Sequence, residues 1–420
     1  MNRVTGAAPR PLRRQLASGA VAIARRNRIT PAVTFMLAFD AGSAFDPPSR
    51  PGLAAFTARM IDRGTPEHNA DALAEEIEGR GASVDVSSNR QCLMFTVTCL
   101  DDDFEAMLSL VARMAQAPAF PPVQIELRRH ETLTRLTEDD ENTGARASAR
   151  FFERLYGEGH PYAHAPRGTH ASIEALSRAD LEQFHAARVR PACLTAAVAG
   201  DIDETRACDA VAAALHGWNP AGEPPSRSLP APAPPAARDR SVIAVPGKAQ
   251  ADIAYGFLGP GRLDPGYYAY WVMNTVLGQY GMGGRLGENI RERQGMAYYA
   301  YSSYDAHRIP GPLLVRAGVD PANIDRTIAA IDDEIARIAR DGVTREERDN
   351  AVRFLIGSIP RLLETNAGIA QFLVTTEQFG LGEDFDRRLP SLLSAVTVEQ
   401  ASAAAAGLDP ARAVLAVAGP

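Results

Sequence analysis

The amino-acid sequence predicts an α+β fold of two similar domains, each an antiparallel-rich sheet with helices packed on one face. The chain has 420 residues, more than one hydrophobic core usually organises. Seven prolines fall within residues 219–240, a stretch that favours extended conformation and cannot form a core of its own. The halves on either side of this stretch repeat one order of strands and helices. We therefore expect domains at 1–220 and 241–420, joined by a Pro-rich linker at 221–240.

The first half is expected to open with two strands around a polar turn, in LASGAVAIARRNRITPAVTFMLAFDAG (16–42). The first 39 residues contain seven arginines and no acidic residue, and LASGAVAIA is similar to a weak secretory segment, so a transit or signal peptide is the alternative. No apolar run reaches the roughly 18 residues that a membrane span needs. We expect a soluble, cytoplasmic protein without a membrane partner, and a periplasmic location stays open.

Residues 52–65, GLAAFTARMIDRGT, predict an amphipathic helix whose second face is nearly empty. Leu53, Phe56 and Met60 recur at helical spacing and form its apolar side. The opposite side carries only small or cationic side chains: Ala55, Ala58 and Arg59. Methyl groups and a guanidinium offer no lone pair to a metal ion.

Each half then continues with strands and a long helix and closes on a strand that ends in glycine. The first half contains GASVDVSSNRQCLMFTVTCL (81–100), DDFEAMLSLVARMAQA (102–117) and CLTAAVAGD (193–201). The second half contains ADIAYGFLGP (251–260), IDRTIAAIDDEIARIAR (324–340) and RAVLAVAGP (412–420). This repetition indicates a duplicated domain.

Composition excludes some functions. The net charge of −7 argues against a protein that binds nucleic acid by neutralising phosphates. Of the 44 basic residues only Lys248 is lysine, which we interpret as coding bias in a GC-rich, bacterial genome. Cys92 and Cys99, seven residues apart in a strand-like run, face opposite sides of the sheet and cannot bond to each other. We expect the four cysteines to be reduced, buried thiols.

Two further patterns in the sequence are candidate ligand sites. GGRLGENIRERQGMAYYAYSSYD (283–305) predicts a glycine-rich loop, a short helix that stops at Gly295 and a tyrosine-rich strand, but its glycines fit no nucleotide-binding pattern. GHPYAHAPRGTH (159–170) brings three histidines together in sequence: His160, His164 and His170. Pro161 and Pro166 prevent a regular helix from presenting them on one face, so we expect a loop with ordinary hydrogen bonds rather than a metal site.

Several stretches resemble, in the right order, the pitrilysin and insulinase zinc metallopeptidases, the family that includes mitochondrial processing peptidase. The resemblance is carried by GLAAFTARMIDRGT, YGEGHPYAHAPRGTHASIEALSRADLEQFHAARVRPACLTAAVAGDID, GGRLGENIRERQGMAYYAYSS and VTVEQASAAAAGLDPARAVLAVAGP. It runs from about residue 16 to the C-terminus. It implies a fold that forms one half of a clamshell.

Catalytic members of this family carry H-x-x-E-H, in which two histidines bind zinc and the glutamate is the general base. Here that motif falls on Ala55-Phe56-Thr57-Ala58-Arg59, so all three functional residues are absent and we expect no metal in this chain. The resemblance places a third ligand, a glutamate, within RRHETLTRLTEDDEN (128–142), where Glu131 and Glu138 lie nearby and neither is in register. The acidic run 138–141 is expected to be a solvated loop.

The resemblance also implies that an arginine, and a tyrosine seven positions later, reach the active site from the second domain or subunit. Arg291 and Tyr298 match this spacing, and would donate hydrogen bonds to the scissile carbonyl and its oxyanion. Strand alternation puts Tyr298 and Tyr304 on one face and Tyr299 and Tyr301 on the other, so the spacing alone selects Tyr298. The alternative is a surface helix charge and a half-buried strand aromatic.

These features lead us to expect a non-catalytic subunit of a heterodimeric zinc metalloendopeptidase, not an enzyme on its own. A homologous partner with H-x-x-E-H would supply zinc and base, while this chain, without a cofactor, would supply Arg291 and Tyr298 and half of a peptide-degrading chamber. Its substrate would be a peptide or an unfolded polypeptide. Whether the loop 278–287 contacts that substrate, as a longer loop does in processing-peptidase relatives, stays open. The alternatives are a purely structural core-type subunit and a homodimeric peptide-binding module.

Overall fold

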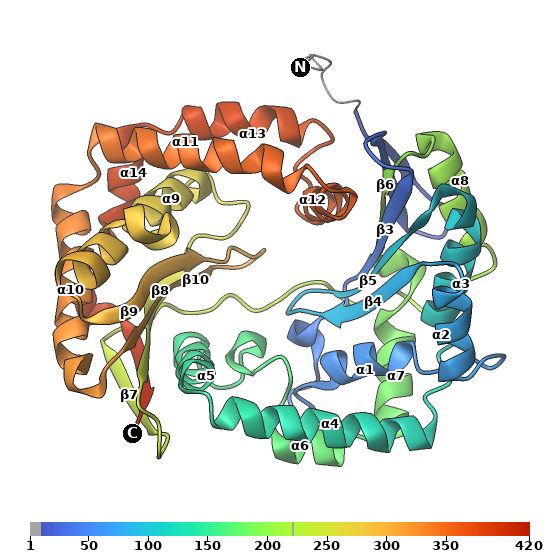
Figure 1. The fold of residues 1–420 in the computed structure, drawn as a ribbon, viewed down its shortest axis with the longest axis horizontal. Helices are drawn as coiled ribbons and strands as arrows, with labels where there is room; N and C mark the ends of the chain where they lie inside the picture. Colours follow the sequence, from blue (N-terminus) through green and yellow to red (C-terminus); the bar gives the residue numbers. More distant parts are fainter. Residues whose placement is uncertain (1–9, 221) are drawn as a thin grey trace. The chain divides into compact units, whose positions relative to one another are not determined.

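The computed structural model describes residues 10–220 and 222–420, and Figure 1 shows their fold. These residues form two compact units, each assembled from three segments of the chain. The first unit comprises Met1–Leu133, Pro166–Ser228 and Pro360–Asp386, and the second comprises Thr134–Ala165, Leu229–Ile359 and Arg387–Pro420. Both units therefore draw on both halves of the sequence. The linear division at 1–220, 221–240 and 241–420 stays a prediction about the order of domains along the chain.

The first unit contains a six-stranded sheet in the order β1-β2-β6-β3-β5-β4. Its strands are β1 (Leu12–Gln15), β2 (Val21–Arg26), β3 (Ala32–Phe39), β4 (Ser83–Ser88), β5 (Leu93–Leu100) and β6 (Leu194–Gly200). β2 and β6 run parallel, and the other neighbours are antiparallel. The central β3 is buried along almost its whole length, whereas the edge strand β4 alternates between half-buried and exposed residues. The two strands expected around the polar turn are confirmed as β2 and β3.

The second unit contains a five-stranded sheet in the order β7-β11-β8-β10-β9. Its strands are β7 (Asp239–Ala244), β8 (Ala251–Gly259), β9 (Ala297–Tyr304), β10 (Gly311–Val319) and β11 (Val414–Gly419). β7 and β11 run parallel, and the other neighbours are antiparallel. In sequence order, this is the arrangement of β2-β6-β3-β5-β4: first strand, last, second, fourth, third. The predicted duplication is therefore visible in the topology, and only β1 has no counterpart.

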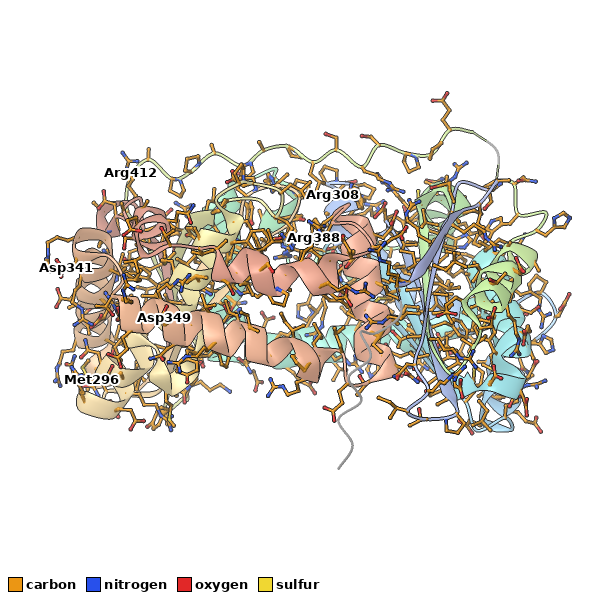
Figure 2. All side chains as sticks on the ribbon, turned by 90° about the horizontal axis from the view of Figure 1, so that it is seen from above. Met296, Arg308, Asp341, Asp349, Arg388 and Arg412 are labelled. Carbon is orange, nitrogen blue, oxygen red and sulfur yellow. The ribbon has the colours of Figure 1, made fainter. Side chains whose placement is uncertain are left out.

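Helices complete both units. Those of the first unit are α1 (Leu53–Ile61), α2 (Ala70–Glu78), α3 (Phe104–Gln116), α6 (His170–Ala175), α7 (Arg178–Arg188), α8 (Glu204–Ala214) and α12 (Asn366–Gln378). Those of the second are α5 (Thr143–Tyr156), α9 (Tyr267–Asn274), α10 (Ile324–Asp341), α14 (Val398–Ala405) and the π-helices η5 (Thr275–Gln279) and η7 (Gly287–Arg293). Three helices contain residues of both units: α4 (Pro122–Asp140), α11 (Arg345–Leu362) and α13 (Phe385–Ser394). Asp341 and Asp349, on α10 and α11, are labelled in Figure 2.

In the first unit, helices cover both faces of the sheet. Phe35 of β3 packs edge-to-face on Phe104 of α3, with ring centroids 5.6 Å apart. The next residue, Met36, points to the opposite face and packs with Ile369 and Leu373 of α12. Figure 1 shows α3 and α8 along one face of this sheet and α12 along the other. The second face is thus covered by a helix from the C-terminal half of the sequence.

The second unit mirrors this arrangement. Tyr255 of β8 donates a hydrogen bond to Asp332 of α10 at 2.9 Å. Asp252, on the opposite face of β8, accepts one from Thr143 of α5. A helix from the N-terminal half of the sequence therefore covers the second face of this sheet. The predicted fold class is confirmed, with the addition that each sheet also carries one helix on its second face.

The proline-rich segment has no helix or strand in its described residues before β7 begins at Asp239. The strand thus takes the last two residues of the expected linker, because they pair with β11. The beginning of the segment is held by side chains of the first unit. Arg190 donates hydrogen bonds to the carbonyl oxygens of Pro220, Gly222 and Glu223 at 2.6–3.2 Å. This part of the segment is therefore fixed by contacts rather than loosely tethered.

The cysteines and helices agree with two of the sequence expectations. All four cysteines are buried and free. Burial raises the pKa of the Cys99 thiol to about 12, which keeps it protonated and unreactive at neutral pH. Within residues 10–220 and 222–420, no helix is long and apolar enough to cross a bilayer.

Candidate functional site

The helix α1 carries the degenerate motif and begins at an unusual turn. Gly52, the residue before it, has a φ of 94°, a left-handed conformation that favours glycine. The carboxylate of Asp46 accepts hydrogen bonds from the backbone N–H groups of Gly52 and Ala54, each at 2.8 Å. Burial raises the pKa of Asp46 to about 7, although the N–H groups at the start of α1 oppose this shift. A buried carboxyl group therefore caps the helix that bears the motif.

The side chains at the motif positions on α1 are packed against the core or held in an ion pair. Ala58 is 1% exposed and has become part of the core, and Ala55 is half-buried. Arg59 donates to Glu131 of α4, with 2.6 Å between Nη2 and Oε2. Arg128 also donates to both oxygens of Glu131, at 2.8 and 2.6 Å. Two guanidinium groups thus share one carboxylate where the family resemblance implies a metal.

The structure shows which of the two candidate glutamates lies beside the motif positions on α1. Glu131 lies beside the motif position Arg59, whereas Glu138 lies about two turns further along α4 and is exposed. The residues at this place do not fit a zinc ion, because two methyl groups and a cation replace the ligands and base, and the remaining carboxylate is held by two arginines. In the described part of the chain, no group of three or more His, Cys, Asp or Glu residues is arranged to hold a metal.

One expectation about α4 is wrong. The acidic run 138–141 was expected to form a loop, but Glu138, Asp139 and Asp140 form the last turn of α4. Acidic residues are unfavourable at a helix C-terminus, where the helix dipole is negative. Nearby cations offset this effect, because Asp140 pairs with Arg146 and Glu141 pairs with Lys248. The run is largely exposed, so only its conformation differs from the prediction.

The second candidate site lies on η7 and β9. Arg291 belongs to the seven-residue π-helix η7, which ends at Arg293, two residues before Gly295 with its φ of 61°. π-Helical turns are rare and frequently occur at functional sites. The side chain of Arg291 is 43% exposed, with its Nη1 2.7 Å from the sulfur of Met282 and 3.8 Å from the carboxylate of Glu292. A thioether is a weak acceptor, so this contact leaves the exposed guanidinium group able to donate to a ligand.

Tyr298 lies at an irregularity in the edge strand β9. Val319 of β10 pairs with Ala297 and Gly318 pairs with Tyr299, so Tyr298 is the extra residue of a β-bulge. It is 63% exposed, whereas Tyr304 is half-buried against Tyr270. The expected shared face of Tyr298 and Tyr304 therefore does not lead to a shared environment. Met296, labelled in Figure 2, is 4% exposed and anchors the chain just before the bulge.

The glycine-rich loop before η7 owes its glycines to close packing. A Cβ atom on Gly278 would lie 2.5 Å from the backbone nitrogen of Ser302, and Gly281 has a φ of 68°. Arg285 anchors the loop through hydrogen bonds of 2.7 and 2.8 Å to Glu347. The loop is thus a compact support for η7, and this packing accounts for the glycines without a bound nucleotide.

In the histidine-rich segment 159–170, His160 makes ordinary hydrogen bonds to residues of its own unit. The Nδ1 atom of His160 accepts from the backbone N–H of Tyr162 at 3.0 Å, and its Nε2 lies 3.0 Å from the carbonyl oxygen of Pro230. Both ring nitrogens are therefore engaged. The His160 ring also stacks on Tyr156, with centroids 4.9 Å apart.

Comparison with known proteins gives consistent matches. The profile described as "Insulinase (Peptidase family M16)" matches residues 21–160, and that described as "Peptidase M16 inactive domain" matches residues 175–355. The crystal structure of a peptidase M16 inactive domain from Pseudomonas fluorescens superposes with a TM-score of 0.91 at 29% identity, covering 98% of each chain.

Relatives with assigned names fall into peptidase and non-peptidase groups. An uncharacterized zinc protease of Mycobacterium leprae is 28% identical and covers 88% of this chain and 82% of its own. The non-peptidase homolog YmxG of Helicobacter pylori is 25% identical and covers 90% and 86%. Cytochrome b-c1 complex subunit 1 of Bos taurus is 25% identical over 61% of this chain and 53% of its own.

The fold and the matches define a protein of the zinc-peptidase type, built from a duplicated α+β unit. The chain belongs to peptidase family M16, the insulinase family. The sequence contains no H-x-x-E-H motif, and the expectation from the resemblance is that Ala55, Ala58 and Arg59 stand at its positions.

Proposed function

We propose that this chain is a non-catalytic subunit of a zinc peptidase and completes the active site of a homologous partner chain. The observation that carries the proposal is the contrast between its two candidate sites. On α1, the motif positions are filled by methyl groups and an ion-paired arginine. On η7 and β9, Arg291 and Tyr298 are both exposed on the same unit. The non-peptidase relative YmxG supports a role without catalysis by the chain itself.

The chemistry of the second pair suits transition-state stabilisation. When an amide carbonyl is attacked, negative charge develops on its oxygen, and donors that are already oriented stabilise that charge. Arg291 carries a permanent charge and several N–H donors, and Tyr298 carries a neutral O–H donor. In the proposal, a partner with an intact H-x-x-E-H motif supplies the metal and the base, and these two side chains bind the carbonyl oxygen.

The sheets offer suitable places for an extended peptide. β4 and β9 are edge strands, so each leaves one side of its backbone without a partner strand in its sheet. A peptide can add to such an edge through main-chain hydrogen bonds, which gives affinity with broad sequence tolerance. This geometry supports peptides or unfolded segments as the substrate class. A stable partner interface would bury more than about 1,000 Å².

Reconstitution tests the proposal. The chain purified alone is expected to contain no stoichiometric zinc and to leave a quenched fluorescent peptide uncleaved. The partner to test is an H-x-x-E-H homologue that co-purifies with it or is encoded in the adjacent reading frame. Mixing the two is expected to produce zinc-dependent cleavage that neither chain shows alone. Zinc binding and cleavage by the isolated chain would overturn the proposal.

A purely structural role is the second candidate, because cytochrome b-c1 complex subunit 1 is among the similar proteins. A scaffold needs neither an exposed arginine nor an exposed tyrosine at this spacing. The two candidates therefore differ in whether activity of the assembly depends on Arg291 and Tyr298.

A further inference from the structure

Arg316 occupies an unusual position for a cation. It lies on β10, an interior strand of the second sheet, and its direct cross-strand neighbours are Ala254 of β8 and Tyr301 of β9. Its side chain is partly buried on the sheet face that α5 covers, because its Nε lies 3.5 Å from the Oγ of Ser148 of that helix. An arginine in the middle of a sheet face normally has an anionic partner.

Among the described residues, no carboxylate lies within ion-pair distance of the guanidinium group of Arg316. Its hydrogen bonds are long ones to two neutral hydroxyl groups, Ser148 at 3.5 Å and Ser303 at 3.4 Å. Arg285, a buried arginine of the same unit, instead makes a two-pronged ion pair with Glu347.

The carboxylate in the adjoining row of the same face, that of Asp252, is already hydrogen-bonded to neutral donors. Asp252 accepts hydrogen bonds from the hydroxyl groups of Thr143 and Tyr299 and from the Nε2 of Gln250, the last at 3.2 Å to each oxygen. Its row of the sheet, with Tyr299 at the β9 end, directly adjoins the row of Arg316. The carboxylate of Asp252 is therefore hydrogen-bonded to other residues and forms no ion pair with Arg316.

The surroundings of Arg316 favour an anion that comes from outside. Its neighbours Ser148, Ser303 and Tyr301 all carry hydroxyl groups that can donate. Tyr301 is 38% exposed, so this side of the face is accessible along the edge strand β9. We propose that Arg316 binds a carboxylate group of a bound peptide, with the hydroxyl groups of Ser148, Ser303 and Tyr301 as additional donors. The peptide ligand rests on the proposed function, whereas the site itself requires no partner chain.

Fluorescence polarisation with the full chain alone tests this site. The probes are three fluorescein-labelled forms of one unstructured, otherwise uncharged peptide: a C-terminal acid, a C-terminal amide, and the amide with one internal glutamate. At least one carboxylate-bearing form is expected to bind about tenfold more tightly than the neutral amide. Comparison of the acid with the glutamate form shows whether a chain end or a side chain supplies the carboxylate.

Variants assign the preference to Arg316. Arg316→Gln is expected to abolish the preference for carboxylate and to leave binding of the neutral amide unchanged, and Arg316→Lys to retain part of it, because lysine keeps the charge but not the planar fork. Arg326→Gln, at an exposed position of α10, is the control for net charge and should keep the full preference. Equal binding of all three peptides, or a preference that survives in a folded Arg316→Gln protein, would overturn the proposal. Arg291→Ala should not alter the preference, which separates this test from that of the proposed function.

Discussion

The two units use the same place in a duplicated topology for different chemistry. In the first unit, α1 and α2 connect the second and third strands of the duplicated set, β3 and β4. In the second, α9, η5 and η7 connect the corresponding strands β8 and β9. The first connection carries the degenerate motif, and its Arg59 forms an ion pair with Glu131. The second exposes Arg291 and Tyr298. We call the motif positions on α1 together with Glu131 the closed site, and Arg291 together with Tyr298 the open site. The same fold thus carries one site of each kind.

The difference in helix type explains part of this contrast. α1 is a regular helix with a capped start, so its side chains repeat in register with the core below them. η5 and η7 are π-helices, whose wider turns are less stable and persist where the surroundings hold them. Here that support comes from the buried Arg285–Glu347 ion pair and from Asn289, which donates to Glu334 at 2.6 Å. A segment whose backbone is held by such contacts can keep exposed side chains in fixed positions.

The largest expected effect lies in the open site. In a reconstituted pair with an H-x-x-E-H partner, Arg291→Ala and Tyr298→Phe should each lower kcat by roughly 10²- to 10³-fold, because each removes a donor to the oxyanion. KM should change much less, since the lost interaction is made mainly in the transition state. Steady-state cleavage of a quenched fluorescent peptide measures both constants.

Arg293→Ala is the matched control, because Arg293 lies two residues away, is 66% exposed and pairs with Glu288. It should leave kcat within about twofold of the unmodified pair, as expected for an exposed ion pair. If both site variants retain full activity in a complex that is active, the second unit contributes no catalytic donors and the structural alternative gains support.

The secondary structure of both units follows from local patterns in the sequence. Alternating residues in LMFTVTCL give β5 its regular inward and outward pattern, and the largely apolar run AVTFMLAF is typical of the strand that it forms, β3. The helical spacing of Ile328, Ile331, Ile335 and Ile338 gave α10, and all four are buried. These elements were predictable because the signal and the structure are both local.

Contacts between distant segments were not predictable in this way. α12 packs on β3 and β6, and α5 packs on β8 and β11, although each helix lies in the other half of the sequence. α5 is strongly amphipathic, whereas α12 is apolar around much of its circumference, and neither pattern identifies the sheet that the helix faces. Only the three-dimensional structure shows that helices pack on both faces of each sheet, so the prediction of helices on one face was incomplete.

The candidate sites show the same limit. Counting residues could not distinguish Glu131 from Glu138, because the distance from α1 to the right turn of α4 depends on the connections between them. Tyr298 was selected by family spacing, but its exposure results from a one-residue bulge that strand alternation cannot anticipate. Arg316 was missed, although a lone arginine in the apolar run GPLLVRAGV was a visible signal.

The closed site should show its role in stability rather than in activity. Glu131→Gln removes the charge that Arg59 and Arg128 share, so the free energy of unfolding should fall by about 1–2 kcal/mol. The partial exposure of these side chains keeps the effect below that of a fully buried pair. Urea unfolding followed by circular dichroism measures the change.

Glu182→Gln provides the comparison for this effect. Glu182 pairs with Arg178 on α7, and both side chains are 51% exposed, so the variant should change stability by less than about 0.5 kcal/mol. Glu131→Gln should also leave kcat of the reconstituted pair unchanged. A loss of activity without a loss of stability would show that the closed site takes part in the reaction after all.

A further effect on stability, visible only as a pH dependence, concerns the cap of α1. Burial raises the pKa of Asp46 to about 7, well above the value near 4 expected in the unfolded chain. Between these values the folded protein holds a proton that the unfolded chain has lost, so stability must decrease as pH rises from about 4 to 7 and then level off. Asp46→Asn cannot titrate and removes this contribution. From pH 5 to pH 7.5, the unmodified protein should therefore lose about 2 kcal/mol relative to Asp46→Asn, measured by urea unfolding at both values. Parallel pH profiles would mean that Asp46 is already ionised at pH 5 and that the N–H groups at the start of α1 outweigh its burial.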